Sequence, residues 1–328
     1  MKRTIILLLV AVLLPSCQFR PLDIETDGMR VVLLGDMSLP FGSKGGDPYH
    51  YAILLYDADG ALVYEDFCGP EGGLIHSVPG SYHVLACSLD GSTVLFDGRG
   101  QLNTFHATAA EADPETKRLF LACRETAGHE EASGRTKAVD DDALVLIEPD
   151  AIYSGQLGGL EVPVLTESDD EFTFTIETSF ALSQGQFVIT GLTHTDRIGS
   201  VQVFLTGLSA GRRIADGQPD AATAVQTFYL NSIVEGRLQG TFNYFGTPVT
   251  VAEKNMAYIV VTDTGGGRYL FVADVTAQIH GNEHPQAEID LAFDIPDPAV
   301  GGGGFQPTVG DWDVIFIDVP IRNTIHGQ

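Results

Sequence analysis

The first residues that could do chemistry form a serine motif between two glycines. Residues 207–211 read GLSAG, which matches the G-x-S-x-G pattern of serine hydrolases. That motif works because a sharp turn from a parallel strand into a helix exposes the serine. Residues 212–219 read RRIADGQP and do not resemble such a helix. A hydrolase that uses Ser209 is therefore the third hypothesis for function, and a strand followed by a turn is the preferred interpretation.

Two kinds of segment offer metal ligands. Residues 280–284 read HGNEH, but the central Gly-Asn favours a turn over the helix that aligns two histidines on zinc. Residues 57–60 (DADG) and 140–142 (DDD) carry carboxylates of the kind that Ca²⁺ prefers, without the spacing of an EF-hand loop. We expect solvated turns at all of these positions, and neither a metal site nor a cofactor.

The cysteines leave two interpretations open. Cys68, Cys87 and Cys123 lie in the N-terminal half of the chain, and Cys87 and Cys123 each end an apolar run. Outside the cytoplasm two of the three can form a disulfide, which leaves one free thiol. Three buried thiols that act as small apolar side chains are the equal alternative.

Aromatic side chains point to a second hypothesis for function. Tyr49, Tyr51, Tyr56 and Tyr64 cluster in one predicted hairpin, and Trp312 is the single tryptophan. Exposed aromatic rings can stack on sugars, so a glycan-binding surface protein for nutrient capture is the alternative. Most tyrosines in strands instead pack their rings and keep the hydroxyl wet.

The N-terminus has the features of an export signal with a lipid attachment site. Two basic residues precede an apolar run over residues 5–14, which is too short to span a bilayer permanently. Residues 14–17 read LPSC, a lipobox pattern that predicts lipidation of Cys17 after removal of residues 1–16. Residues 17–27 would then form the lipid-anchored segment. We expect a protein of the outer membrane or cell surface whose contact with the membrane is its lipid.

The charge of the chain excludes one class of partner. The sequence holds 44 acidic and 18 basic residues, for a net charge of −26. A chain this acidic is repelled by phosphate backbones, so we expect no nucleic-acid binding.

The elements that must position these residues are mostly strands. Residues 172–178, 269–279, 289–295 and 315–321 alternate apolar and polar side chains. Alternation of this kind is typical of antiparallel strands with one face on a core. Turn signals separate the strands, among them residues 57–60 between two apolar runs and the Pro79-Gly80 pair. The sequence predicts an all-β fold of antiparallel sandwiches.

The sequence also predicts one short helix, one exposed loop and the boundary between two domains. Asp113 and Pro114 form an N-cap followed by proline at the first helical position, and predict a helix of one or two turns. The polar residues 125–143 are interpreted as an exposed loop, and the glycine-rich residues 148–160 as an inter-domain junction. We therefore expect an N-terminal domain over residues 28–152 and a C-terminal domain over residues 153–328.

Several short motifs, taken in order, carry a resemblance to a known family. They are CQFRPL at residues 17–22, PGSYHVL at 79–85, ITGL at 189–192, LTGL at 205–208, GGGF at 302–305 and DWD at 311–313. With them the chain resembles a large group of Bacteroidales lipoproteins that carry a domain of unknown function. That group is similar to the fimbrillin-like, or type V pilin-like, proteins, and the likeness covers nearly all of the mature chain.

The resemblance implies two tandem transthyretin-like β-sandwich domains and a non-enzymatic role as pilus subunit, pilus anchor or surface adhesin. It implies other fimbrillin-like subunits or surface glycans as partners. In type V pilins an arginine-specific protease removes the first strand, and Arg30 is the candidate cut site here. A partner strand then fills a groove by β-strand complementation. The candidate donor or groove-lining residues lie in the terminal strand: Val314, Ile315, Phe316, Ile317, Val319 and Ile321.

Overall fold

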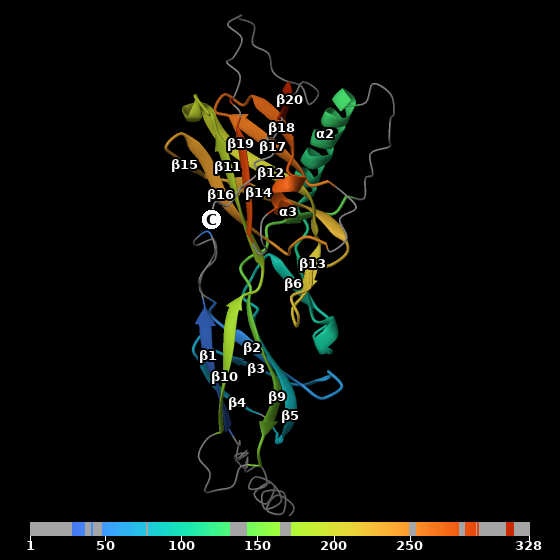
Figure 1. Cartoon of the computed structure of the whole chain (residues 1–328), viewed down its shortest axis with the longest axis vertical. Helices are drawn as coiled ribbons and strands as arrows, with labels where there is room; N and C mark the ends of the chain where they lie inside the picture. The colour runs from blue at the N-terminus through green and yellow to red at the C-terminus, as the bar shows by residue number, and fades with distance from the viewer. Residues whose placement is uncertain are drawn as a thin grey trace, which may run out of the picture.

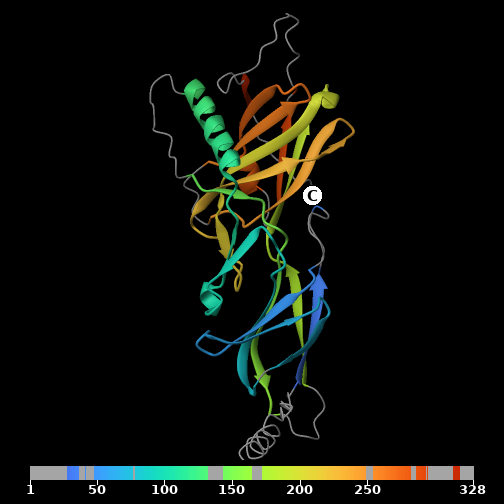
Figure 2. The ribbon, with the colours of Figure 1, turned by 180° about the vertical axis from the view of Figure 1, so that it is seen from behind.

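The molecule is elongated, with two lobes of β-sheet stacked along its longest axis (Figures 1 and 2). The computed structural model describes residues 28–36, 41, 48–76, 78–131, 143–164, 172–248, 254–281, 286–292, 294 and 313–317. Cys17, the predicted signal peptide, Trp312, Val319 and Ile321 lie outside these residues. No helix within the described ranges is long and apolar enough to cross a membrane.

The first lobe is a seven-stranded sheet that curls around its own core. Its strand order is β3-β2-β5-β9-β10-β1-β4. A hairpin joins the two outermost strands, and across it the His76 amide donates to Asp66 Oδ2 at 3.1 Å. Alternate residues therefore point inward, and in β10 Phe174, Ile176 and Thr178 are buried while their neighbours are exposed. The strands are β1 (Gly28–Asp36), β2 (Tyr51–Tyr56), β3 (Leu62–Cys68), β4 (Gly72–His76), β5 (Gly80–Ser88), β9 (Tyr153–Val162) and β10 (Phe172–Phe180).

The predicted turn between β2 and β3 is confirmed, and its aspartate has a structural use. Asp57 Oδ1 accepts hydrogen bonds from the amides of Asp59 at 3.0 Å and Ala61 at 2.8 Å. Gly60 has a φ of +78°, a conformation that favours glycine. The carboxylate of Asp57 thus closes the hairpin.

The second lobe is a sandwich of two sheets. A four-stranded sheet of order β15-β16-β11-β19 packs on a six-stranded sheet of order β20-β18-β17-β12-β14-β8. Buried apolar side chains from both sheets fill the space between them, with Phe187, Phe228 and Phe242 at the centre. Its strands are β8 (Val145–Ile147), β11 (Ser183–Thr190), β12 (Ile198–Ser209), β14 (Thr223–Leu230), β15 (Ser232–Val234), β16 (Arg237–Tyr244), β17 (Met256–Asp263), β18 (Arg268–Asp274), β19 (Gln286–Ala292) and β20 (Asp313–Ile317).

The predicted fold class, all-β with two tandem sandwiches, is confirmed, and the pairing is mixed in direction. Antiparallel pairs predominate, but four pairs of described strands are parallel: β1 with β10, β11 with β19, β14 with β8, and β18 with β20. Each parallel pair joins strands that are distant in the sequence. Local turns could therefore not specify these pairs.

The chain crosses between the lobes more than once. Strands β9 and β10 follow the predicted boundary at residue 152 but pair with β5 and β1 in the first lobe. Strand β8 precedes that boundary and pairs with β14 in the second lobe. A small sheet of β6 (Val94–Asp97), β7 (His106–Ala109) and β13 (Gly211–Arg213) also combines strands from both halves of the sequence.

A shared apolar core joins the lobes. It contains Ala52, Leu54 and Tyr56 on the outer face of β2 together with Ile214 and Phe245 from the second half of the chain. Because the inner face of β2 packs in the first-lobe core, all six of its residues are buried. The lobes are thus joined by hydrophobic packing, which is unlike a simple linker.

Helix α2 (Pro114–Glu131) is longer than predicted. The N-cap is confirmed, since Asp113 Oδ1 accepts the amides of Glu115 at 2.8 Å and Thr116 at 3.0 Å. The prediction of one or two turns, with a loop from residue 125, was wrong because the helix continues to Glu131. Phe120, Cys123 and Ala127 lie on one face of the helix and pack against the outer face of the six-stranded sheet, which stabilises the added turns.

Strand β18 is shorter than its alternating pattern predicted. Alternation over residues 269–279 indicated one strand, but β18 ends at Asp274 and α3 (Thr276–Gly281) follows. Asp274 Oδ1 accepts hydrogen bonds from the Thr276 amide at 3.1 Å and hydroxyl at 2.6 Å. This cap starts a helix whose Ile279 is still buried, so the apolar pattern continues while the backbone changes.

Candidate functional site

Ser209 does not form a nucleophile elbow. It is the last residue of β12 and is 2% exposed, and strand β13 follows it where the motif requires a helix. Its hydroxyl donates to the carbonyl oxygens of Gly211 at 2.8 Å and Asp220 at 2.9 Å. A serine that is buried in this way stabilises a turn and is not presented to a substrate.

The three described cysteines are free thiols in three different cores. Cys68 lies in the first-lobe core, Cys87 in the core shared by the lobes, and Cys123 under α2. Burial raises the pKa of Cys68 to about 11 and that of Cys123 to about 12. The structure thus agrees with the alternative of buried apolar thiols.

The histidine segment does not assemble a metal site in the described part of the chain. His280 lies in α3 with its Nε2 3.0 Å from Asn255 Oδ1, and His284 lies outside the described residues. No group of three or more metal-ligating side chains occurs among the residues that the structure describes.

The tyrosine cluster is mainly core. Tyr51 and Tyr56 are fully buried, and their hydroxyls meet Thr178 Oγ1 at 3.5 Å and the Arg99 carbonyl at 3.1 Å. Tyr49 is the exposed member of the cluster, at 77%. The hairpin therefore does not present a row of aromatic rings to a sugar.

Arg30 lies inside the first strand of the first lobe. In β1 it is opposite Thr173 of β10 on one side and Leu74 of β4 on the other. Cleavage after Arg30 would leave residues 31–36 paired, so this cut alone would not free the whole strand. Processing at Arg30 stays a prediction from the sequence.

The C-terminal strand occupies the edge of the six-stranded sheet. β20 pairs in parallel with β18, with Leu270 opposite Val314, Phe271 opposite Ile315 and Ala273 opposite Ile317. Leu270 and Phe271 are fully buried and point to opposite faces, one to the core under α2 and the other to the core between the sheets. β20 is last in the strand order, so its other side has no neighbour among the described strands.

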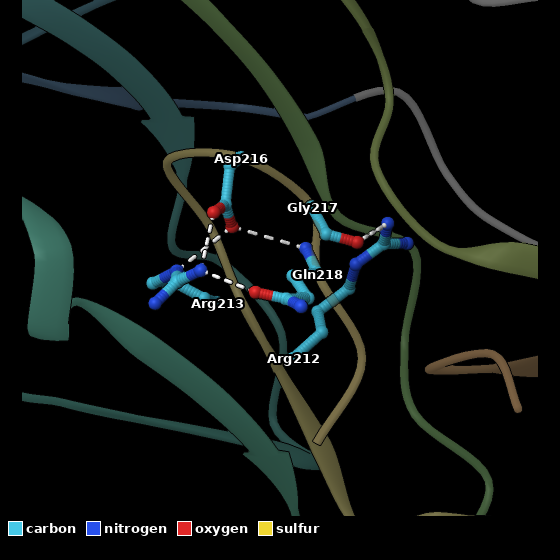
Figure 3. A network of polar contacts seen from close by, with 5 residues as sticks. All are labelled: Arg212, Arg213, Asp216, Gly217 and Gln218. Carbon is cyan, nitrogen blue, oxygen red and sulfur yellow. Dashed lines mark hydrogen bonds and ion pairs between the residues drawn. The ribbon is translucent and has the colours of Figure 1, made fainter. Parts of the chain in front are cut away.

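A cavity of about 830 Å³ lies where the lobes meet. Its walls come from β9, β10, the link into β11, the β13 hairpin and α3. Arg212 of the hairpin projects to one side, where its guanidinium donates to the Gly217 carbonyl (Figure 3). The guanidinium also donates to the carbonyl of Ala181. Burial lowers the pKa of Arg212 from its usual value. No motif in the sequence indicates this site, because its walls are distant along the chain.

A second arginine holds the hairpin from the other side. Arg213 Nε donates to Asp216 Oδ1 at 2.8 Å, and its Nη2 also donates to Asp216 and to the Gln218 side chain (Figure 3). The Gln218 amide donates to Asp216 Oδ1 at 3.1 Å. The hydrogen bond from Arg213 lowers the pKa of Asp216. This network fixes the turn that carries Arg212.

Comparisons with solved structures show the fold. A candidate adhesin from Bacteroides ovatus ATCC 8483 is 14% identical, with 91% of this chain and 94% of that chain covered and a TM-score of 0.53. The fimbrial anchor protein Mfa2 from Porphyromonas gingivalis is 10% identical, with 81% and 90% covered and a TM-score of 0.45. A candidate polysaccharide-binding protein from Bacteroides thetaiotaomicron VPI-5482 is 10% identical, with 82% and 91% covered and a TM-score of 0.47.

The sequence comparisons give the family. No curated protein matches the chain. The family described as Domain of unknown function (DUF5119) matches residues 42–229, a span that includes most of the first lobe, most of the shared core and the β13 hairpin. Because that match covers more than half of the sequence, the chain belongs to the DUF5119 family.

Proposed function

We propose that this chain is a non-enzymatic cell-surface lipoprotein with an adhesive or fimbrial role, anchored through Cys17. The fold that it shares with the Bacteroides ovatus candidate adhesin supports the proposal. The buried and hydrogen-bonded state of Ser209 agrees with a role other than ester hydrolysis. We infer strand exchange with other fimbrillin-like subunits as the mode of contact.

The observation that carries the proposal is the position of β20. Among the described strands it pairs only with β18, in parallel, at one edge of the second-lobe sandwich, and it is five residues long. If β20 left, β18 would present a row of unpaired main-chain groups beside the fully buried Leu270 and Phe271. A strand from a neighbouring subunit could satisfy those groups, with alternate side chains directed into the two cores.

The mode of contact is tested on protein extracted mildly from native cells. Samples are run unheated and heated on a denaturing gel and probed for the mature chain. Strand-exchanged assemblies would give a ladder that collapses on heating. An Ile315→Asp variant, which places a charge in β20, should lose the ladder, and Ile233→Asp at an exposed β15 position should keep it. A single band of mature size without heating would contradict the polymer-forming version of the proposal.

The anchor is tested separately. Replacement of Cys17 by serine should move the protein from the membrane fraction to the soluble fraction, because no acyl chain can be attached. Mass spectrometry of the mature N-terminus should show an acylated cysteine in the parent protein. A parent protein without acyl chains would contradict the lipid anchor and leave the strand-exchange test unaffected.

A further inference from the structure

We propose that the edge of β10 in the first lobe accepts an extended segment of a partner protein, one whose residues are alternately apolar and basic. The added segment would lie beside Thr173 and Thr175 and lengthen the sheet by one strand. This edge belongs to the first lobe, whereas β18 belongs to the second. The proposal therefore does not depend on strand exchange at β18.

Strands β9 and β10 are paired over only a short part of their length. Among the described residues their register contains two pairs, Ser179 with Ser154 and Phe180 with Tyr153. Toward residue 172 the two strands diverge (Figures 1 and 2). On its other side β10 is paired with β1 along its whole length up to Ser179. The lower part of β10 thus has one edge paired and the other edge without a described neighbour.

The unpaired edge of β10 presents main-chain groups of alternate residues. Where the chain leaves β10, the Ala181 amide donates to the Ile152 carbonyl at 2.7 Å, so odd-numbered residues direct their main-chain groups toward β9. Thr173 and Thr175 follow the same alternation, and in the part of the chain that the structure describes no residue pairs with them on that side. Their amide and carbonyl groups are therefore available to an added strand without any change in the pairing of β10 with β1.

Other sheet edges of the molecule are closed, which distinguishes them from the β10 edge. At β19 the Gln278 side chain accepts a hydrogen bond from the Asp290 amide at 3.1 Å and donates to its carbonyl at 3.2 Å, as a neighbouring strand would. At β8 the Ile147 amide donates to the Ala110 carbonyl at 3.0 Å. Strand β9 has a register shift against β5 at residues 158–159, and irregularities of this kind make an edge a poor template for pairing. Strand β10 has no such shift against β1.

Apolar side chains beside this edge are incompletely covered. Phe172 of β10 and Leu157 of β9 are half-buried against the first-lobe core, and Val164 just after β9 is 72% exposed. In a strand added to β10, alternate side chains would point to the same face as the buried Phe174 and Ile176. Apolar residues at those positions would extend the first-lobe core, which explains the apolar half of the expected pattern.

The charge around the edge favours basic residues at the remaining positions. Glu177 of β10 and Glu161 of β9 are exposed, and residues 163–171, which join the two strands, include four acidic and no basic residues. Arg30, opposite Thr173, is the one arginine or lysine in β1, β4, β9 and β10, so the acidic residues predominate. A second copy of this chain, with its net charge of −26, would be repelled. A basic segment of a different protein is therefore the partner that fits.

The test uses the mature chain with Cys17 replaced by serine, and fluorescence anisotropy of a labelled synthetic peptide, TKVKVKT. Two matched peptides serve as controls: TEVEVET reverses the charge, and TKVKVKT with N-methylated central amides cannot donate main-chain hydrogen bonds. We expect TKVKVKT to bind about tenfold more tightly than either control, or better. Equal binding of the N-methylated peptide would overturn strand addition, and equal binding of TEVEVET would overturn the basic partner. The absence of binding by TKVKVKT would overturn both.

Variants of β10 separate main-chain pairing from charge. Thr175→Pro removes the amide that faces the unpaired edge, and proline is tolerated there because the pairing with β1 does not use that amide. It should weaken binding of TKVKVKT by about tenfold or more, whereas Thr175→Val, which keeps the amide, should bind as the parent does. Glu177→Lys should also weaken binding, even if Thr175→Pro does not fold, and Glu288→Lys at an exposed position in β19 is the charge-matched control. Unchanged binding in Glu177→Lys would overturn the site.

Hydrogen exchange locates the bound peptide. Amides of residues 172–177 should gain protection when TKVKVKT is bound, and those of β18 should not change. Protection gained at β18 instead of β10 would overturn the site. A concentration-dependent dimer of the parent chain that Thr175→Pro abolishes would overturn the choice of partner, because the edge would then belong to a second copy. These results are independent of strand exchange by β20, since every variant leaves the sequences of β18 and β20 unchanged.

Discussion

Leu54 lies at the centre of the core that joins the lobes. It is fully buried on the outer face of β2 and belongs to the same core as Phe245 and Ile214 from the second half of the chain. If this core couples the lobes, a cavity made there should destabilise both lobes together. We therefore choose Leu54→Ala as the perturbation.

The size of the effect follows from complete burial. Removal of a buried leucine side chain loses its transfer free energy and leaves a cavity, so the free energy of unfolding should fall by about 3–5 kcal/mol. For a cooperative unit of this size, that loss should lower the melting temperature by roughly 5–10 °C. Leu34→Ala is the matched control, because Leu34 is 56% exposed. Its effect should stay within about 0.5 kcal/mol.

Differential scanning calorimetry and hydrogen exchange provide the readouts. The parent and Leu54→Ala proteins should each unfold in one transition, and amides of β17 in the second lobe should lose protection together with those of β5. Two separate transitions, of which only the first moves in Leu54→Ala, would refute the coupling of the lobes.

Four further predictions follow from the described contacts. Ser209→Ala should leave any background ester cleavage unchanged and destabilise the fold by about 0.5–1.5 kcal/mol in denaturant titrations, because the hydroxyl that bonds to the Gly211 and Asp220 carbonyls is lost while the Gly211 carbonyl keeps the Asp220 amide as a donor. Loss of a genuine esterase activity would contradict this account. Cys68, Cys87 and Cys123 should resist maleimide until the chain unfolds, and rapid labelling of the native protein would argue against their burial. The pKa of Asp113 is lowered in the fold by hydrogen bonds from Thr116, and the pKa of Asp216 by a hydrogen bond from Arg213. Both carboxylates therefore stabilise the fold above their unfolded pKa, and this stabilisation is lost as the pH falls through their folded pKa. A free energy of unfolding that rises as the pH drops below about 4 would contradict this direction. Gly155→Ala should destabilise the contact between β9 and β10, because an added Cβ would lie 2.0 Å from the Glu177 carbonyl oxygen. A melting temperature equal to that of the parent protein would contradict this close contact between the two strands.

Local patterns predicted the parts of the fold that local contacts decide. The alternation of apolar and polar residues in β10 predicted which face of the strand is buried. Residues 57–60 predicted the turn between β2 and β3. The N-cap at Asp113 was visible because its hydrogen bonds reach only three residues along the chain. Each of these features is specified within one turn or one strand.

Features set by distant contacts could not be predicted in the same way. The polar residues after Arg124 indicated a loop, yet packing of Cys123 and Ala127 against the sheet extends the helix. The parallel pairing of β1 with β10 depends on strands that are far apart in the sequence. The cavity could not be predicted for the same reason, because Arg212 and the residues of β9 and β10 line it together only after the lobes have packed.

The most direct test of the central claim asks whether β18 of one molecule accepts β20 of another. Ala273 of β18 lies opposite Ile317 of β20, so one chain carries Ala273→Cys and another carries Ile317→Cys, both with Cys17 replaced by serine. A single chain with both substitutions, which can close the disulfide internally, shows that the geometry permits the bond. After mixing under assembly conditions and mild oxidation, our account predicts a covalent dimer of the two single variants on a non-reducing gel. Internal closure in the double variant with only monomer from the mixture would contradict strand exchange at this edge.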